Sequence, residues 1–207
     1  MVKYIWKDLI DGKIPLDCTE FNCAFHEINE LPELSQTLIK LDCHCNNLSY
    51  LPKLPQALID LDCCFNNLSY LPKLPQALID LDCSFNCLNN LPELPQTLLK
   101  FNCLCNRLSY LPELPQTLKK LDCRCNKLNE LLELPKTLIG LDCSNNKLNE
   151  LPELPQTLEF LCCYKNNIKY LSHENCEIIK KLINVKLLNN PFSANFTDNK
   201  EFISSLE

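Results

Sequence analysis

Glycine is nearly absent from this sequence, with only two residues in 207. Loops that cradle phosphate groups need closely spaced glycines, so nucleotide-binding loops of that kind are excluded. Long hydrophobic runs are absent too: no segment approaches about 18 consecutive apolar residues, and no membrane-spanning helix is expected. The chain also lacks a cluster of lysine or arginine, and its net charge of −6 argues against nucleic acid as a partner.

The N-terminus lacks the unbroken apolar stretch of a secretory signal, because Lys7, Asp8 and Asp11 interrupt it. The sequence therefore predicts a cytoplasmic protein, or one of the host cytoplasm if it comes from an intracellular pathogen or a large DNA virus. Thiols stay reduced in such a compartment, so the sixteen cysteines are not expected to form a disulfide scaffold.

Histidine is also scarce, which limits the catalytic arrangements that the chain can build. His26, His44 and His173 are its three histidines, and none lies beside a credible nucleophile in the sequence. We therefore predict that the protein is not an enzyme and carries no cofactor.

The sequence is rich, by contrast, in an internal repeat. The stretch NNLSYLPKLPQALIDLDC occupies residues 46–63 and returns unchanged at residues 66–83, twenty positions later. Units of this length follow one another from near Cys18 to about Lys181, eight in all, and a weaker ninth ends at Phe192. A fixed period of this kind is the signature of a solenoid. We expect residues 1–17 to form an N-terminal cap, residues 18–192 the repeat array, and residues 193–207 a C-terminal cap or tail.

Each unit carries the pattern L-x-x-L-x-(L/C)-x-x-N-x-L, followed by LPxLPxxL. This pattern resembles the leucine-rich repeat, in the short class found in secreted bacterial effector proteins. The resemblance implies a right-handed curved rod, α/β by convention but mostly β, with a parallel sheet on its concave face and short helical caps. Effector relatives of this class often attach a large ubiquitin-ligase domain, for which this chain is too short, while those with repeats alone act as scaffolds that bind host proteins.

Elementary geometry supports the same fold. In KLDCH the residues Leu41 and Cys43 face one side of a strand, while Lys40, Asp42 and His44 face the other. One such strand per unit, stacked on the next, gives a parallel sheet with about 4.8 Å between strands. Paired prolines in each unit remove backbone donors and fix φ, so the convex side is expected to be extended or polyproline-like.

Two columns of this repeat are expected inside. An asparagine recurs every twenty residues from Asn46 to Asn166, where a buried amide can satisfy the backbone of neighbouring coils. Cysteines recur from Cys23 to Cys163 at the inward strand position, where a free thiol behaves as a small hydrophobe. Disulfides or a metal remain alternatives for these cysteines, although parallel side chains make poor disulfide geometry.

A second set of cysteines precedes the asparagine column and is expected to be more exposed. Cys45, Cys105 and Cys125 share this position with phenylalanines, including Phe65 and Phe85. No histidine completes a zinc-finger spacing with them, and no metal site is predicted. The phenylalanines and cysteines form either an apolar edge to a binding surface or a stacking ladder.

The outward strand positions form the concave surface. Asp60, Asp62, Asp80 and Asp82 crowd one patch there without a counter-charge, while lysines and an arginine follow in the next coils. Two carboxylates about 5 Å apart repel by roughly 1 kcal/mol in water. Nearby lysines, a bound cation, a basic partner, or solvent alone could offset this repulsion.

Both ends of the array need caps, because terminal coils expose apolar faces. Ile5, Trp6, Leu9 and Ile10 lie at helical spacing and predict a short amphipathic helix over the first coil.

The eighth unit is four residues longer than the others and contains SHENCEIIKKL. Ser172 or Asn175 is expected to cap a helix there, and its apolar side would hold Ile178, Ile179 and Leu182. A last helix is expected within residues 197–206.

The sequence thus predicts a non-enzymatic scaffold, monomeric, that binds a protein partner on its concave face. The residues predicted to make the contact are Asp42, Asp60, Asp62, Asp80, Asp82, Lys100, Lys120, Asp122, Arg124, Phe65 and Phe85. Two alternatives stay open: a substrate adaptor for a ubiquitin ligase carried by another chain, and a protein that binds metal through surface thiols or carboxylates.

Overall fold

The computed structural model of the protein describes residues 3–5, 13–195 and 197–206. Short strands of three residues dominate it. They are β1 (Lys3–Ile5), β2 (Glu20–Asn22), β3 (Lys40–Asp42), β4 (Asp60–Asp62), β5 (Asp80–Asp82), β6 (Lys100–Asn102), β7 (Lys120–Asp122), β8 (Gly140–Asp142), β9 (Phe160–Cys162) and β10 (Asn184–Lys186).

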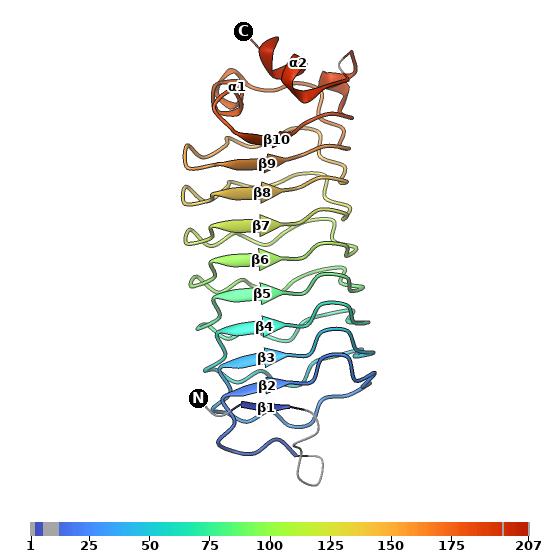
Figure 1. The fold of residues 1–207 in the computed structure, drawn as a ribbon, viewed down its shortest axis with the longest axis vertical. Coiled ribbons are helices and arrows are strands. Elements are labelled where there is room, and N and C mark those ends of the chain that lie inside the picture. The colour runs from blue at the N-terminus through green and yellow to red at the C-terminus, as the bar shows by residue number, and fades with distance from the viewer. Residues whose placement is uncertain (1–2, 6–12, 196, 207) are drawn as a thin grey trace.

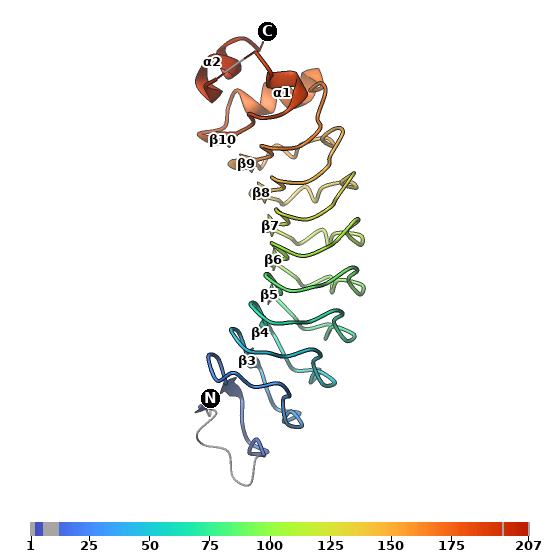
Figure 2. The ribbon, with the colours of Figure 1, turned by 90° about the vertical axis from the view of Figure 1, so that its right-hand side faces the viewer.

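These strands form one parallel sheet of ten strands in sequence order (Figure 1). Each residue pairs with the residue at the same position of the next repeat, as Leu41 does with Leu61 and Leu61 with Leu81. The coils stack into an arc, and the strands lie on its inner side (Figure 2). The predicted leucine-rich repeat solenoid with a concave parallel sheet is therefore confirmed.

The core is a set of columns that run the length of the array. The middle residue of each strand from β2 to β9 is buried, and so is the cysteine that follows each of these strands by one position, such as Cys43, Cys63 and Cys103. Leucines from the rest of each coil complete the core. Burial raises the pKa of Cys43 and Cys63 well above the ordinary thiol value, and all sixteen cysteines are free. The ladder cysteines therefore pack as small hydrophobes.

The back of each coil is extended, as the paired prolines predict. From Glu20 to Leu171, all of which the structure describes, the chain forms strands, turns and irregular backbone but no helix. Leu58 donates to the carbonyl of Pro55 in a tight turn, and the same bond recurs in later coils. A twenty-residue unit has no length left for a convex helix.

The asparagine column ties neighbouring coils together. Asn66 accepts the Leu48 N–H at 3.0 Å and donates to the carbonyls of Cys43 at 3.0 Å and Cys63 at 3.2 Å. Asn46, Asn86, Asn106, Asn126, Asn146 and Asn166 repeat this geometry. Asn190 does the same in the last coil, where it donates to Cys163 and Leu187. A buried amide with every polar atom paired is favourable, since an orphaned one costs about 1–3 kcal/mol.

The residue before each of these asparagines has a left-handed backbone, a feature that the sequence did not reveal because glycine is missing there. The φ angles are positive at Cys45, Phe65, Phe85, Cys105, Cys125, Asn145, Lys165 and Asn189, and also at Phe25, which precedes His26 in the first coil. This conformation costs a residue with a Cβ roughly 1–2 kcal/mol relative to the right-handed region. The coil thus holds a locally unfavourable turn at this position in each repeat.

Glycine at this position is therefore expected to stabilise the array. We expect Cys125→Gly, where φ is 55°, to unfold at a higher denaturant concentration than Cys125→Ala, by about 1 kcal/mol. Ser109 is the matched control position, because it is exposed and its φ is not positive. There Ser109→Ala should be more stable than Ser109→Gly. If Cys125→Ala were more stable than Cys125→Gly, the backbone strain assigned to this left-handed position would be contradicted.

The N-terminal prediction is wrong where the structure describes it. Lys3–Ile5 forms strand β1, which pairs in parallel with β2, and not a helix. Ile5 thus extends the sheet by one strand, because β2 offers an unpaired edge that a strand can satisfy. The other residues of the predicted helix, Trp6, Leu9 and Ile10, lie outside the described residues.

At the other end, the described residues form one short helix after β9 and two after β10. Helix α1 (His173–Ile179) begins at Ser172, whose hydroxyl accepts the Asn175 N–H at 3.1 Å, so Ser172 is the cap. Ile178 and Ile179 are buried, as expected of its apolar side, but the helix ends before Leu182, which is partly buried against the core. The 3-10 helix η2 (Pro191–Ser193) and helix α2 (Asn199–Ser204) complete this end, where Phe202 packs on Phe192 with ring centroids 5.1 Å apart.

Candidate functional site

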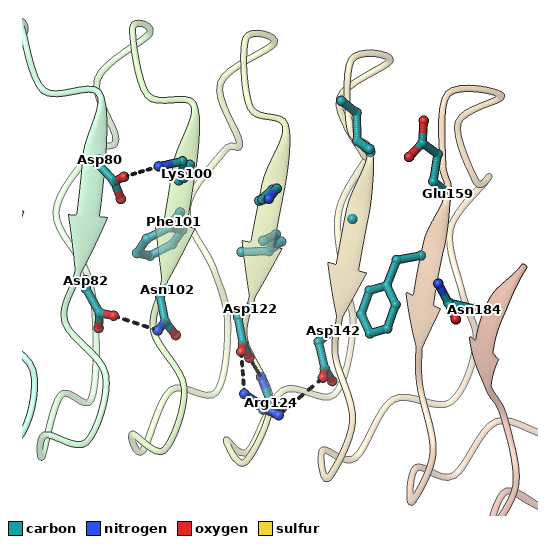
Figure 3. A pocket seen from close by; sticks show the side chains of 15 residues that line it. Asp80, Asp82, Lys100, Phe101, Asn102, Asp122, Arg124, Asp142, Glu159 and Asn184 are labelled. Atoms are coloured by element: carbon teal, nitrogen blue, oxygen red, sulfur yellow. Dashed lines mark hydrogen bonds and ion pairs between the residues drawn. The ribbon is translucent and has the colours of Figure 1, made fainter. Parts of the chain in front are cut away.

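The concave face carries a shallow hollow of about 660 Å³ over strands β5 to β10 (Figure 3). Its residues come mostly from the outward first and third strand positions. They are Asp80, Asp82, Lys100, Phe101, Asn102, Lys120, Leu121, Asp122, Arg124, Ile139, Gly140, Asp142, Glu159, Phe160 and Asn184. Phe101 and Leu121 belong to the buried core, so apolar groups lie beneath a largely charged surface.

Gly140 leaves part of this hollow open over β8. The first outward position of a strand holds a charged residue in β2 to β7, such as Lys120 in β7, and it holds Phe160 in β9. Gly140 has no side chain at that position, and a Cβ built there would lie 4.0 Å from the Phe160 ring. One flank of the half-buried Phe160 ring thus faces a gap that no residue of β8 fills.

The ionic groups around this gap are mostly paired. Lys100 Nζ lies 2.6 Å from the Asp80 carboxylate, and this hydrogen bond raises the pKa of Lys100. Arg124 lies between two carboxylates, 2.9 Å from Asp122 and 3.6 Å from Asp142. Lys120 is exposed and forms no ion pair with any residue that the structure describes. It is therefore the cation of the hollow with its charge available to a ligand.

The aspartates at the first outward strand position do have counter-charges, and neighbouring lysines provide them, which is one of the compensations that the sequence left open. Asp60 pairs with Lys40 at 2.5 Å on one side of the patch, and Asp80 pairs with Lys100 on the other. Each aspartate reaches a lysine one coil away, because parallel pairing places the same strand position of neighbouring coils side by side. Nearby lysines thus supply the compensation for this column.

The column of aspartates and asparagines at the third strand position has a structural role that the sequence did not reveal. The carboxylate of Asp62 accepts the backbone N–H of Cys64 at 3.1 Å, and Asp82 accepts both the N–H and the hydroxyl of Ser84. The side-chain amide of Asn102 does the same for Leu104 at 3.1 Å. Either aspartate or asparagine occupies this position in β2 to β8, since both offer this acceptor. The recurrence of either aspartate or asparagine at this position is the sequence signal that could have revealed the role.

Burial follows from this role. Side chains of Asp42, Asp62 and Asp122 are half-buried, and Asp142 is buried. Burial raises the pKa of Asp62, and the charges of Asp82 and Asp42 raise it further. The ionised form of Asp62 is therefore less favourable in the folded state than in the unfolded chain.

We expect Asp62→Asn to stabilise the protein at neutral pH. Asparagine keeps the acceptor for the Cys64 N–H, as it does at Asn22 and Asn102, and removes a repulsion of about 1 kcal/mol. A raised pKa means that the folded state binds the proton more tightly, so wild-type stability rises as pH falls through the raised pKa towards the ordinary value. The advantage of the variant should therefore shrink and vanish near pH 4.

Chemical unfolding from pH 7 to pH 4, with a chelator present, measures this difference. Asp60→Asn is the control, because it removes a carboxylate that is paired with Lys40 and should give no gain. An equal gain at all pH values, or no gain at pH 7, would contradict the cause assigned to the Asp62 shift.

The predicted contact residues divide into three groups. Asp80, Asp82, Lys100, Lys120, Asp122 and Arg124 line the hollow, whereas Asp42, Asp60 and Asp62 lie on the same face nearer the N-terminus. Phe65 and Phe85 lie beyond the strand ends and stack on each other, with ring centroids 4.0 Å apart. The residues that the sequence prediction omitted are chiefly Ile139, Gly140, Glu159, Phe160 and Asn184. A glycine at an outward strand position, in a chain with two glycines, was the available signal.

None of the helices in the described part of the chain is long and apolar enough to cross a membrane.

Three solved structures of similar proteins share this architecture. YopM, a leucine-rich effector protein from Yersinia pestis, is 35% identical with a TM-score of 0.79, and the match covers 84% of this chain and 51% of that one. The leucine-rich repeat domain of a Shigella effector is 31% identical with a TM-score of 0.63, covering 86% of this chain and 72% of that one. The functional domain of InlJ from Listeria monocytogenes, which includes a cysteine ladder, is 25% identical with a TM-score of 0.73, covering 91% and 42%.

This chain thus spans about half the length of the YopM structure. No protein-family model matches the sequence, and no curated protein matches it either. The repeat pattern, the ten-stranded parallel sheet and the likeness to the Shigella domain over most of both chains nevertheless agree with one another. The chain belongs to the leucine-rich repeat proteins.

Proposed function

We propose that the chain is a non-enzymatic scaffold that binds one protein partner on its concave face, with the hollow at Gly140 as the centre of the contact. Similarity to leucine-rich repeat effector proteins supports a protein-interaction scaffold in general terms. The particular face, partner chemistry, monomeric state and cytoplasmic location are part of the proposal.

The observation that carries the proposal is the gap beside Phe160. A partner side chain that is aromatic or aliphatic would bury the exposed flank of this ring and displace water from the gap left by Gly140. Aromatic residues in pockets of this kind are the usual anchors of protein interfaces. Lys120 at the rim would then pair with an acidic group of the partner next to that anchor.

The rest of the face would supply complementarity around this anchor. Asp80 and Lys100 are held in place by their ion pair, and Asp122 and Arg124 by theirs, so these side chains lose little freedom on binding. Asp42, Asp60 and Asp62 would extend the contact toward the N-terminal coils, and Phe65 and Phe85 toward the edge of the sheet. Such preorganisation favours affinity without new contacts.

Filling the gap tests the proposal. Gly140→Phe copies the residue that the next coil carries at the same position, and Gly140→Ala adds a methyl group at an ordinary contact distance. A protein captured from the native host cell by the wild type, and then identified, should bind Gly140→Ala with nearly unchanged affinity. Its affinity for Gly140→Phe should fall about tenfold or more.

Lys120→Glu provides a second variant, and the exposed Lys119 in the neighbouring position provides its control. Lys120→Glu should weaken the same partner, whereas Lys119→Glu should not. Unchanged affinity in both Gly140→Phe and Lys120→Glu would remove the hollow from the contact.

A further inference from the structure

Three side chains with metal-binding atoms converge on the concave face at the ends of β3 and β4, away from the hollow. His44 Nδ1 lies 2.5 Å from a carboxylate oxygen of Asp42 and 3.9 Å from one of Asp62. The ligand atoms of all three residues lie within 4.8 Å of one another. His44 is the only histidine at this strand-end position, because the other coils carry Ala24, Cys64, Ser84 and other residues there.

Among the aspartates at the third strand position, Asp62 has the fewest polar partners to offset its charge. The Asn22 amide donates to Asp42 at 2.9 Å from one side, and the Asn102 amide donates to Asp82 at 2.8 Å from the other. Asp62 lies between these two carboxylates, and its described partners are the N–H and thiol of Cys64 and the more distant His44 ring. The middle of the column thus has three neighbouring carboxylates and an imidazole, and no ammonium or guanidinium group of the described residues is paired to them.

We propose that Asp42, His44 and Asp62 bind a borderline divalent cation of the Zn²⁺ class. An imidazole nitrogen with two carboxylate oxygens is a ligand set that zinc accepts, and a water molecule would complete the four ligands. Tetrahedral ligands at about 2.0–2.1 Å from zinc lie about 3.3 Å from one another. The separations of 2.5 and 3.9 Å around His44 bracket this value, so small rotations of these half-buried side chains would close the site.

The ligating nitrogen cannot carry a proton. Neutral His44 has one ring proton, which moves to Nε2 through solvent exchange when Nδ1 binds the metal. The charge of the cation then offsets the repulsion between Asp42 and Asp62, so binding stabilises the folded chain by mass action.

A second cluster, Asp62 with Cys64 and Asp82, adjoins the first and shares Asp62. Asp62 belongs to both clusters, so we expect a single cation, and we place it on the His44 side. The Cys64 thiol is half-buried and hydrogen-bonded to Asp62, whereas the first cluster offers an imidazole nitrogen beside two carboxylates. Calcium, which prefers six or more oxygen ligands, should bind weakly here.

Zinc titration of the reduced full chain tests the site, with histidine side-chain NMR signals as the first measurement. The chain has three histidines, so His26 and His173 act as internal references. One equivalent of Zn²⁺ should shift the His44 signals selectively and raise the unfolding temperature. Calcium at the same concentration should leave both unchanged.

Two substitutions that copy neighbouring coils separate this site from the surface thiols. His44→Ser repeats the residue of position 84, and Asp62→Asn repeats that of position 102, so the fold tolerates both. Each should weaken Zn²⁺ binding by about tenfold or more in calorimetry. Asp142→Asn, a change in the same column with Arg124 nearby and no histidine, should leave the affinity unchanged.

Absence of stoichiometric zinc binding overturns the proposal. So does zinc binding that leaves the His44 signals unshifted or survives both substitutions, since thiols such as Cys45 and Cys125 would then be the ligands. The inference does not rest on the proposed docking function, and partner binding measured with and without a chelator keeps the two separate.

Discussion

Asn66→Ala is expected to lower the free energy of unfolding by about 3–5 kcal/mol. The Asn66 side chain makes four hydrogen bonds of 3.0–3.2 Å inside the array. Its removal leaves the buried Leu48 N–H without its acceptor, which costs about 1–3 kcal/mol, and it removes two amide N–H donors, shared among three carbonyls, that contribute about 0.5–1.5 kcal/mol each. No other residue type of similar size can donate to two coils and accept from one.

Asn67→Ala is the matched control, because Asn67 is the next residue along the chain and its side chain is exposed. Its cost should stay within about 0.5 kcal/mol. Equilibrium urea unfolding measures both variants. Similar costs for Asn66→Ala and Asn67→Ala would contradict the structural role of the asparagine column.

Phe101→Ala is expected to cost about 3–5 kcal/mol through the cavity that it leaves. Phe101 is one of the largest fully buried side chains, and it lies at the centre of the sheet in β6, between Leu81 and Leu121. In a solenoid each coil packs only on its neighbours, so damage at this place weakens both halves of the array.

Phe160→Ala separates burial from residue type. Phe160 is the first residue of β9 and points outward, whereas Phe101 is the second residue of β6 and points inward. Phe160→Ala should cost less than about 1 kcal/mol in stability while it removes one wall of the hollow. Calorimetry or urea unfolding of both variants decides this, and a larger loss in Phe160→Ala would reverse the assignment of inward and outward positions.

Much of the architecture could be predicted from the sequence, because the pattern and the period of the repeat determine which residues face inward and how the strands pair. Alternation around Leu41 and Cys43 identifies the inward face of each strand, and the twenty-residue period fixes the parallel register. The asparagine column also follows from sequence, since a polar residue at a buried place must pair with backbone. These features depend on spacing alone and repeat in every coil.

The concave face was harder to predict because its chemistry depends on contacts between coils. The pairing of Asp60 with Lys40, and not with a partner or solvent, required knowledge of which side chains lie side by side. The role of Asp62 as a backbone acceptor depends on the turn after the strand.

The left-handed residue before each asparagine was also hidden, because Phe65 and Cys125 occupy a conformation that usually signals glycine. Ile5 illustrates the last limit, because the spacing of apolar residues in the sequence did not indicate that Ile5 would pair with the free edge of β2.

The division of each coil into an inward and an outward side is tested most directly by the alkylation rates of cysteines two residues apart. Cys43 and Cys123 are fully buried, whereas Cys45 and Cys125 are partly exposed. Mass spectrometry of the folded protein should show that Cys45 and Cys125 are alkylated at least about tenfold faster than Cys43 and Cys123. The thiols of Cys43 and Cys123 can react only after the coil opens locally. All sixteen thiols should react after unfolding without reductant. Equal rates within the pairs, or thiols that stay blocked after unfolding, would contradict a solenoid with a reduced cysteine ladder at its core.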